Sequence, residues 1–419
     1  MTRFLYALLW LVATPFVLAR LAWRARRQPG YLDRVGERFG RYPPALPGPY
    51  IWIHAVSVGE TRAAAPLVEE LKARHPSHNI LVTHMTPTGR ATGHEVFGDR
   101  VERAWLPYDM GFAVRRFLAH YRPALGIVLE TEIWPRLFEE AARESIPVVL
   151  ANGRLSERSA RRYARVPALT RWAFANLAGV AAQTDADAQR FAAIGARSIA
   201  VTGNVKFDLA VPDAMMRLGE RFAERFGAGR TVWVAASTRD GEEALLLDAL
   251  ARAAPPPAVL LVIVPRHPQR FDAVARLAEA RGLGVARRSE EAPVAASTRV
   301  VIGDSMGEML AYYAAADVAI IGGSLLAFGG QNLIEACALG LPVIVGPHTY
   351  NFAEAAESAI AAGAALRVAD ADAALQAAAR LDPERRREMG RHAREFVAAH
   401  RGAVQRLVDW IEATAASRG

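Results

Sequence analysis

Glu60 follows an apolar segment at residues 50–56 (YIWIHAV) that is typical of a buried strand. Its surroundings read Ser57-Val58-Gly59-Glu60, where the glycine lets the backbone approach a ligand and the acid opens the next helix. A carboxylate in that place can act as a general base. The alternative is a first-turn acid that only complements the helix dipole.

Two more acids, Glu130 and Glu132, follow a second apolar run at residues 124–129 (ALGIVL). Pro135 then suits a helix start. Thr131 or Glu132 could cap that helix, so Glu130 is the acid that needs another explanation.

The second half of the chain places cations and glycines after its strands. Arg266 and His267 follow residues 258–264 (AVLLVIV), where a guanidinium could meet a phosphate. Glycine turns at 322–323 and 329–330 lead into a helix start at 332–335, whose free N–H groups attract phosphate. Glu335 could accept hydrogen bonds from a ribose. Tight turns are the plainer explanation of the glycines.

Two Asp-x-Asp segments, 185–187 and 370–372, raise the possibility of a metal-bound sugar nucleotide. Each precedes an Ala-rich helix, so capping is the favoured interpretation. The sequence also has no His and Cys cluster with zinc spacing. We therefore predict chemistry without a metal and without a cofactor.

These residues need a scaffold that brings strand ends together. Strands and helices alternate along both halves, which predicts parallel doubly wound sheets that bind ligands beyond their carboxyl ends. The pattern restarts after residues 202–204 (TGN). Expected strands are 50–56, 79–83, 124–129, 147–150, 179–182, 231–235, 258–264, 300–302 and 318–321. Expected helices include 60–74, 134–143, 353–365, 371–381 and a long final helix at 383–417.

Length and composition agree with two domains. The chain has 419 residues, and 52% hydrophobic content supplies two cores. The single cysteine, Cys337, excludes an internal disulfide. A net charge of +8 favours anionic partners, and the absence of zinc, RNA-binding and helix-turn-helix signatures argues against nucleic acid.

The N-terminal segment predicts a membrane anchor. Residues 4–19 carry no charge, and the basic residues Arg24, Arg26 and Arg27 follow, as expected on the cytoplasmic side beside anionic headgroups. A cleaved signal peptide is disfavoured because the basic cluster follows the apolar run. Both a membrane-spanning helix and an interfacial helix remain open, since Pro15 and the borderline length permit either.

Taken together, the motifs resemble those of the 3-deoxy-D-manno-octulosonic acid (Kdo) transferases. The resemblance extends over nearly the whole chain and is carried by these segments: GERFG (36–40), HAVSVGE (54–60), MTPTG (85–89), LPYD (106–109), ETEIWP (130–135), ANGRLS (151–156), GNVKFD (203–208), PRHP (265–268) and GPHTYNF (346–352).

The resemblance implies a GT-B fold with two Rossmann-like doubly wound domains facing a central cleft, and an enzyme of the inner membrane with its catalytic domains on the cytoplasmic side. We expect an anchor at 1–28, an acceptor-binding domain at 29–207 and a nucleotide-sugar domain at 208–419, whose last helix packs back on the first domain. The implied reaction is inverting, metal-independent transfer of Kdo from CMP-Kdo to a lipid A precursor, lipid IVA, in lipopolysaccharide biosynthesis.

The resemblance also implies residue roles. Glu60 corresponds to the proton acceptor, and Glu130 and Lys206 to transition-state stabilisers. The expected CMP-Kdo contacts are Arg266, His267, Gly307, Glu308, Met309, Asn332, Leu333, Ile334 and Glu335, and the expected acceptor or cleft contacts are Ser57, Gly59 and Arg62. The chain departs from the family at Arg239 and Gln331, where His is frequent, and at Leu333, where proline is commoner.

Two other functions compete with this one. A different GT-B enzyme, either a sugar-nucleotide epimerase or another glycosyltransferase, would share the nucleotide cleft. A non-catalytic lipopolysaccharide-binding protein would explain the anchor and the arginine content, but Glu60, Glu130, Lys206 and Arg266 occurring together argue for catalysis.

Overall fold

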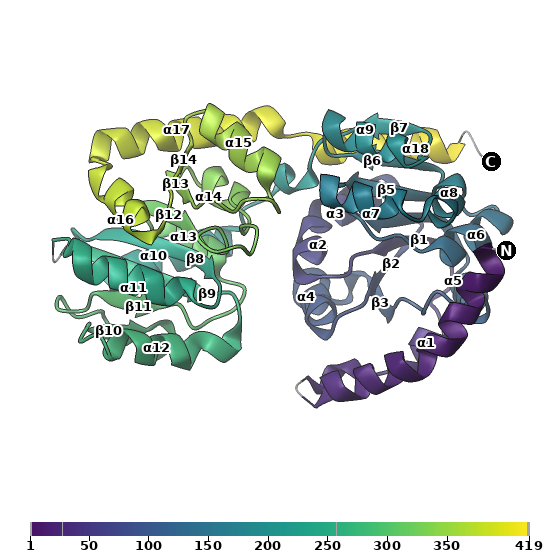
Figure 1. Cartoon of the computed structure of the whole chain (residues 1–419), viewed down its shortest axis with the longest axis horizontal. Helices are drawn as coiled ribbons and strands as arrows, with labels where there is room; N and C mark the ends of the chain where they lie inside the picture. The colour runs from purple at the N-terminus through teal and green to yellow at the C-terminus, as the bar shows by residue number, and fades with distance from the viewer. Residues whose placement is uncertain (1, 27, 257, 417–419) are drawn as a thin grey trace. The chain divides into compact units, whose positions relative to one another are not determined.

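The computed structural model describes residues 2–26, 28–256 and 258–416, and it divides into two compact units. Unit 1 comprises Met1–Asp208 together with Arg401–Gly419, and unit 2 comprises Leu209–His400. Figure 1 shows each unit as a sheet covered by helices.

The described part of unit 1 has a seven-stranded parallel sheet in the order β3-β2-β1-β4-β5-β6-β7. Its inner strands are almost fully buried, as expected of a parallel sheet covered on both faces, whereas the edge strand β7 is partly exposed. The strands are β1 (Tyr50–His54), β2 (Asn79–His84), β3 (Glu102–Trp105), β4 (Pro123–Leu129), β5 (Val148–Gly153), β6 (Gly179–Ala182) and β7 (Ile199–Val201). The helices are α1 (Thr2–Ala25), α2 (Val58–Ala63), α3 (Ala65–Arg74), α4 (Pro87–Phe97), α5 (Gly111–Tyr121), α6 (Pro135–Arg143), α7 (Glu157–Ala164), α8 (Pro167–Ala175), α9 (Asp185–Ala193) and α18 (Ala403–Ala416), with short 3-10 turns η1 (Pro29–Tyr31), η2 (Val35–Phe39), η3 (Gly98–Arg100) and η4 (Val205–Asp208).

Alternate residues of β1 supply two separate cores in unit 1. Ile51 and Ile53 belong to one buried cluster, whereas Tyr50 and Trp52 belong to another. Successive side chains of a strand point to opposite sheet faces, so a continuous apolar strand such as β1 stabilises both helical layers at once.

The described part of unit 2 repeats the architecture, with strand order β10-β11-β9-β8-β12-β13-β14 and parallel pairing throughout. The strands are β8 (Thr231–Thr238), β9 (Val259–Pro265), β10 (Val285–Arg287), β11 (Val300–Ile302), β12 (Val318–Ile321), β13 (Val343–Val345) and β14 (Ala365–Arg367). The helices are α10 (Asp213–Phe226), α11 (Glu242–Ala253), α12 (Phe271–Glu279), α13 (Met309–Ala314), α14 (Ile334–Ala338), α15 (Ala353–Ala361), α16 (Ala371–Arg380) and α17 (Pro383–His400), with 3-10 turns η5 (Pro268–Arg270) and η6 (Arg288–Glu290).

The predicted strands are all present, but several elements differ from the prediction. The helix expected at 60–74 is two helices, because Pro66 begins a second helix after Ala64. The helix expected at 353–365 ends at Ala361, and 365–367 form β14. Five strands were not predicted: β3, β7, β10, β13 and β14, which have only three or four residues each.

The final helix expected at 383–417 is also two helices, α17 and α18, separated at residues 401–402. Gly402 has a φ of 82°, which ends α17 with a backbone conformation that suits glycine. The carboxylate of Asp208 then accepts hydrogen bonds from the backbone N–H groups of Gly402 and Val404, each at 2.6 Å. Residues 401–419 therefore belong to unit 1, and the second domain does not extend over the whole of 208–419.

Each strand order reverses once beside its central strand. In unit 1 the chain leaves β1 toward β2 and β3 and returns to β4 on the other side of β1. In unit 2 it leaves β8 toward β9, β10 and β11 and returns to β12 on the other side of β8. The crevice outside the carboxyl ends at such a switch point is where open α/β sheets bind ligands.

Candidate active site

Glu60 lies at the switch point of unit 1, in the first turn of α2 after β1. Ser57 caps this helix. The Glu60 carboxylate accepts hydrogen bonds from the Val56 N–H at 2.8 Å and from the Ser57 hydroxyl at 2.9 Å. These local bonds fix the rotamer of Glu60, so the acid both supports the helix start and is held in one position.

The Glu60 carboxyl is tuned for proton transfer near neutral pH. Burial, followed by the negative charge of Glu130, raises its pKa to about 7. The hydrogen bonds from Val56 and Ser57 act in the opposite direction. A general base is most effective when its pKa is close to the working pH, which makes Glu60 a suitable proton acceptor.

Glu130 and Lys206 form an ion pair beside Glu60. Lys206 Nζ lies 2.6 Å from Glu130 Oε1, with only 15% and 22% of the two side chains exposed. Burial would raise the pKa of Glu130, but the charge and hydrogen bond of Lys206, with a contribution from Arg154, lower it below its ordinary value. Glu130 thus stays ionised. Lys206 is held in place by this ion pair, although its local sequence alone would suggest a solvent-exposed lysine.

The backbone that carries this pair is held by asparagines that the sequence analysis did not single out. Asn152 Oδ1 accepts a hydrogen bond from Val205 N at 3.2 Å, and Asn204 Oδ1 accepts one from Lys206 N at 3.0 Å. Asn152 and Glu130 both have φ values in the left-handed region, 52° and 60°. In the sequence, Asn152 and Glu130 could be noticed only as polar residues at the end of buried apolar strands.

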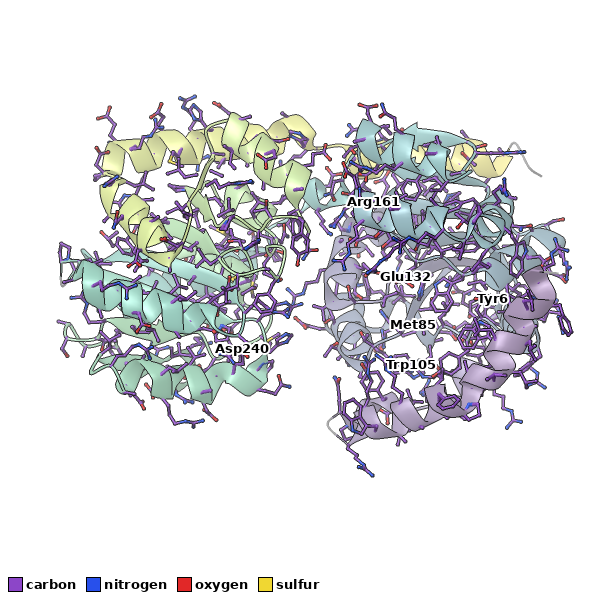
Figure 2. All side chains as sticks on the ribbon, viewed as in Figure 1. Tyr6, Met85, Trp105, Glu132, Arg161 and Asp240 are labelled. Atoms are coloured by element: carbon purple, nitrogen blue, oxygen red, sulfur yellow. The ribbon has the colours of Figure 1, made fainter. Side chains whose placement is uncertain are left out.

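Glu132 is a third acid in the same loop after β4 (Figure 2). Burial and the nearby charge of Glu130 raise its pKa. The alternative that Thr131 or Glu132 caps α6 does not hold, because the helix begins at Pro135 and its Arg136 and Leu137 N–H groups donate to the carboxylate of Asp109. Glu132 therefore does not cap α6, so helix capping does not explain why this acid is present.

The predicted acceptor contacts differ in where they lie. Ser57 touches Glu60 directly, and the exposed Gly59 lies in the same turn. Arg62 instead pairs with Glu95 of α4, with its terminal nitrogen 3.2 Å from Glu95 Oε1. Arg62 is thus engaged on the outer face of α2 and α4, and the structure does not bring it to the Glu60–Glu130 group.

In unit 2 the switch point is organised by Glu242, a fully buried acid in the first turn of α11. Its carboxylate accepts four backbone N–H hydrogen bonds, from Arg239, Gly323, Leu325 and Leu326, at 2.6 to 3.3 Å. Gly322 also has no room for a side chain, since a Cβ there would lie 2.6 Å from the Ser237 carbonyl oxygen. The glycine turn after β12 is therefore clamped against the loop after β8.

Cations gather at the same edge of unit 2. Arg266 follows β9, and its N–H donates to the Thr238 carbonyl at the end of β8. Arg239 lies with its guanidinium 4.8 Å from the ring centre of Phe328. Partial burial and the charges of Arg239, Arg266 and Arg270 lower the pKa of His267. His267 is consequently neutral at pH 7, and the arginines carry the positive charge; Asp240 lies in the same loop after β8 (Figure 2).

Among the predicted CMP-Kdo contacts in the loop after β11, Glu308 is already engaged with a partner in unit 2. Glu308 forms a bidentate pair with Arg288, at 3.1 and 3.2 Å, just before Met309 begins α13. Gly307 has a φ of 85° and lets this loop turn. Arg288 was not predicted, and its position twenty residues before Glu308 gives no periodic signal.

The segment 332–335 offers its backbone and two polar side chains. Asn332 accepts from Ile334 N and donates to Glu335 Oε1 at 3.0 Å. Leu333 and Ile334 are buried, so their side chains belong to the core. Helix α14 has only five residues and one of its first N–H groups is already paired, so its dipole attracts phosphate less than the sequence suggested.

The Asp-x-Asp segments serve other purposes. Asp370 caps α16 by accepting from Ala373 N at 2.8 Å. Asp187 accepts from Leu155 N and from the hydroxyl of Thr184, which is the cap of α9. A cavity of about 1120 Å³ in unit 1 lies along β3 and α4 and contains none of the predicted site residues.

Comparisons with known proteins show the family of the chain. A family model described as 3-deoxy-D-manno-octulosonic-acid transferase (kdotransferase) matches residues 33–209, and one described as glycosyl transferases group 1 matches residues 245–396. The chain is 47% identical to the 3-deoxy-D-manno-octulosonic acid transferase of Bordetella pertussis, over 94% of this chain and 96% of that protein. It is 38% identical to the transferase of the same name from Haemophilus influenzae, over 98% of both.

Solved structures support the fold class. The crystal structure of UDP-GlcNAc 2-epimerase from Neisseria meningitidis matches with a TM-score of 0.61 and 15% identity, covering 87% of this chain and 100% of that one. At this identity the likeness shows the fold alone. The predicted GT-B class, with two Rossmann-like doubly wound domains, is confirmed.

Proposed function

This chain belongs to the Kdo transferase family and is a glycosyltransferase, and on that premise we propose that it transfers Kdo from CMP-Kdo to lipid IVA in lipopolysaccharide biosynthesis. The observation that carries the proposal is the Glu60 carboxyl, held at a sheet switch point with its pKa raised to about 7. That group matches the base that an inverting transfer to a sugar hydroxyl requires.

In the proposed reaction, Glu60 accepts the proton of the acceptor hydroxyl. The hydroxyl oxygen bonds to the anomeric carbon of Kdo, while the bond from that carbon to the CMP phosphate oxygen breaks and its electron pair leaves with CMP. Attack from the face opposite the leaving group inverts the anomeric configuration. Ser57 and the Val56 N–H keep Glu60 oriented for this step.

The Glu130–Lys206 pair has two roles in this proposal. Glu130 raises the pKa of Glu60 through its negative charge, and it holds the Lys206 ammonium in place. The fixed cation then stabilises negative charge that develops in the transition state, and it needs little reorganisation because Asn152 and Asn204 already position its backbone.

Unit 2 holds the donor in this proposal. CMP-Kdo carries a phosphate and a carboxylate, and the Arg239 and Arg266 group at the switch point supplies cations for both. Neutral His267 donates or accepts a hydrogen bond, and Glu335 with Asn332 binds the ribose. Gly307, Glu308 and Met309 line the adjoining loop. The proposed transfer needs no metal, because these arginines and Lys206 provide the positive charge that a metal would supply.

We also propose that the protein works at the inner membrane with both units on the cytoplasmic side. The lipid acceptor requires contact with a bilayer, and helix Arg3–Ala25 is long and apolar enough to provide it by length and composition. Of the basic cluster that follows, Arg24 and Arg26 are exposed, whereas Arg27 lies outside the described residues.

The deciding experiment mixes purified protein, CMP-Kdo and lipid IVA and measures the lipid products by mass spectrometry. We expect lipid IVA to gain the mass of one or more Kdo residues and CMP to be released. The same mixture without acceptor controls for CMP-Kdo hydrolysis. Folded protein that binds CMP-Kdo but leaves lipid IVA unmodified would contradict the proposal.

A further inference from the structure

Helix α1 contacts the body of unit 1 along its entire length. Residues with reduced exposure recur every three or four positions from the first to the last turn: Tyr6, Trp10, Ala13, Thr14, Val17, Leu21 and Ala25. This spacing is one stripe of a helix, so the same face rests on the protein throughout. A helix that left the protein to enter a bilayer would show contacts at one end only.

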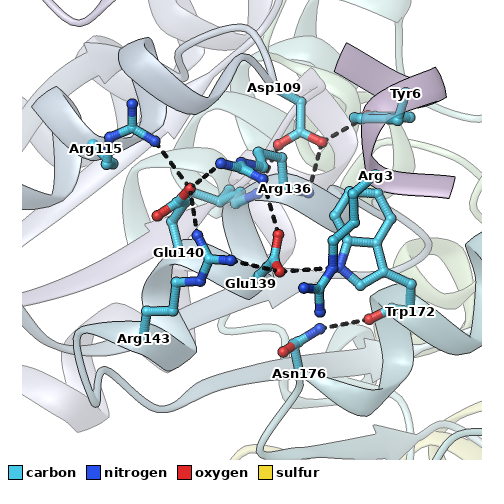
Figure 3. A network of polar contacts seen from close by, with 11 residues as sticks. Arg3, Tyr6, Asp109, Arg115, Arg136, Glu139, Glu140, Arg143, Trp172 and Asn176 are labelled. Carbon is cyan, nitrogen blue, oxygen red and sulfur yellow. Dashed lines mark hydrogen bonds and ion pairs between the residues drawn. The ribbon is translucent and has the colours of Figure 1, made fainter. Parts of the chain in front are cut away.

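The N-terminal end of α1 is fixed by a buried polar network (Figure 3). The Tyr6 hydroxyl donates to Asp109 at 2.6 Å, and the same carboxylate accepts the N–H groups that begin α6. Arg3 Nε lies 2.9 Å from Glu139, an acid that is only 3% exposed. Because Asp109 and Glu139 are buried in the body of unit 1, Arg3 and Tyr6 must lie against that body.

Aromatic and apolar contacts fix the rest of the helix. Tyr6 packs edge-on against Trp172 with ring centres 5.4 Å apart, and Trp10 packs against Tyr108 at 5.8 Å. At the other end Leu21 is buried and the Arg24 guanidinium lies 5.5 Å from the ring centre of Tyr31. The first turns therefore lie against the folded body of unit 1, and the last turn packs on η1, the turn that follows the helix in the same unit.

The opposite face of α1 is apolar and exposed. It consists of Phe4, Leu5, Leu8, Leu9, Leu11, Val12, Phe16, Leu18 and Trp23, with exposures between 38% and 73%. Exposed Arg20, Arg24 and Arg26 lie toward the C-terminal end. An apolar stripe beside arginines is complementary to acyl chains beneath anionic headgroups.

A spanning helix has its ends on opposite sides of about 30 Å of hydrocarbon. Both ends of α1 cannot satisfy that geometry while they contact one globular unit. Pro15 adds to the argument, because it leaves a backbone carbonyl without its helical partner, which is tolerated at an interface more easily than in hydrocarbon.

We propose that α1 lies in the plane of the bilayer surface as a docked interfacial helix, with its apolar face in the acyl chains and its arginines on anionic lipid headgroups. This inference rests on the proposed membrane attachment and specifies its mode. It also implies that unit 1 is held against the bilayer on the side of α1, close to the lipid acceptor.

The test is a fluorescence scan of α1 in the full-length protein. Cys337 is buried, so it is replaced by alanine to give a background without thiols. Single cysteines at Leu8, Leu11 and Phe16 on the exposed face, and at Ala13 and Val17 on the docked face, carry an environment-sensitive fluorophore. Emission is compared with and without vesicles of phosphatidylcholine alone or with 30% phosphatidylglycerol, on the order of bacterial anionic lipid content.

A docked interfacial helix predicts a periodic result. Labels at Leu8, Leu11 and Phe16 shift to shorter wavelength on binding anionic vesicles, whereas labels at Ala13 and Val17 do not change. A uniform shift at all five positions would mean that α1 leaves unit 1 to span the bilayer, and would overturn the inference. No binding to either vesicle would overturn the attachment itself, and a vesicle-independent shift that grows with protein concentration would identify a second copy as the occupant instead.

Two variants sharpen the test. Leu9→Glu places a charge in the apolar face and should lower partition onto anionic vesicles by about tenfold or more. Arg24→Gln with Arg26→Gln should lower it by about fivefold per charge and weaken its dependence on phosphatidylglycerol, since Arg20 remains. Val201→Glu, a similarly exposed apolar residue on β7, is the matched control and should bind like the parent. Equal losses in the control and in Leu9→Glu would contradict a specific role for α1.

Discussion

The two units place a glutamate at the same point of the same fold and use it differently. Glu60 and Glu242 each lie in the first turn of the helix after the central strand of their sheet. Glu242 accepts four backbone N–H groups, so its lone pairs are committed to holding the glycine turn. Glu60 accepts one backbone N–H and one hydroxyl, which leaves it free to accept a proton.

The surroundings of the two acids are opposite in charge. Around Glu60, Glu130 and Glu132 raise its pKa, while Lys206 in its ion pair with Glu130 limits the repulsion. On the Glu242 side, the loops present Arg239 and Arg266 beside His267, while Arg270 is paired with Asp240 and Glu243. In the proposed function, one fold would therefore deprotonate an acceptor in unit 1 and bind an anionic donor in unit 2, with the local charge deciding which.

The largest expected effect is a loss of transfer activity in a Glu60 variant, which would distinguish Glu60 from Glu242. Glu60→Gln keeps an acceptor for the Val56 N–H but removes the base, so the rate of Kdo transfer should fall by about a thousandfold. Melting temperature and CMP affinity, measured by scanning calorimetry and titration calorimetry, should stay close to the parent. A folded Glu60→Gln protein with full transfer activity would remove the proposed mechanism.

The same substitution in unit 2 should act on stability. Glu242→Gln leaves several buried N–H groups with poor acceptors and should lower the free energy of unfolding of unit 2 by about 2 to 4 kcal/mol. Denaturant titration followed by far-UV circular dichroism would measure it. Glu279→Gln, on the outer part of α12, is the control. A Glu242→Gln protein as stable as the parent but inactive would mean that both acids are catalytic.

A third prediction uses pH. Only deprotonated Glu60 can accept the proton, so kcat/KM should rise with pH through about 7. Glu130→Gln removes the neighbouring negative charge, so this limb should move to lower pH while the maximal rate falls about tenfold or more. An unmoved limb, measured over pH 5 to 9, would show that Glu130 does not act on Glu60.

The sequence predicted the longer strands and singled out Glu60 and Glu130, because long apolar runs followed by polar residues are local signals, but it did not single out Glu242. It did not predict β3, β7 or β13, since strands of three or four residues are defined by their neighbours and not by their own pattern. Lys206 needed the family resemblance, because its ion pair joins residues 76 positions apart in the chain. The sequence did not predict the capping of α6 by Asp109 or the hydrogen bond from Tyr6 to Asp109, because these contacts also join residues far apart in the chain.

The smallest expected effect concerns Arg239, in the loop after β8. Its guanidinium stacks on Phe328 next to the glycine turn, so Arg239→Leu keeps the apolar contact and removes the charge. If the unit 2 loops bind an anionic donor, KM for CMP-Kdo should rise by about five- to tenfold with kcat nearly unchanged. Arg252→Leu, an exposed arginine paired with Asp372 away from the switch point, controls for net charge. A fall in kcat without a change in KM would place Arg239 at the transition state, and the contrast between a proton-accepting unit and a donor-binding unit would have to be redrawn.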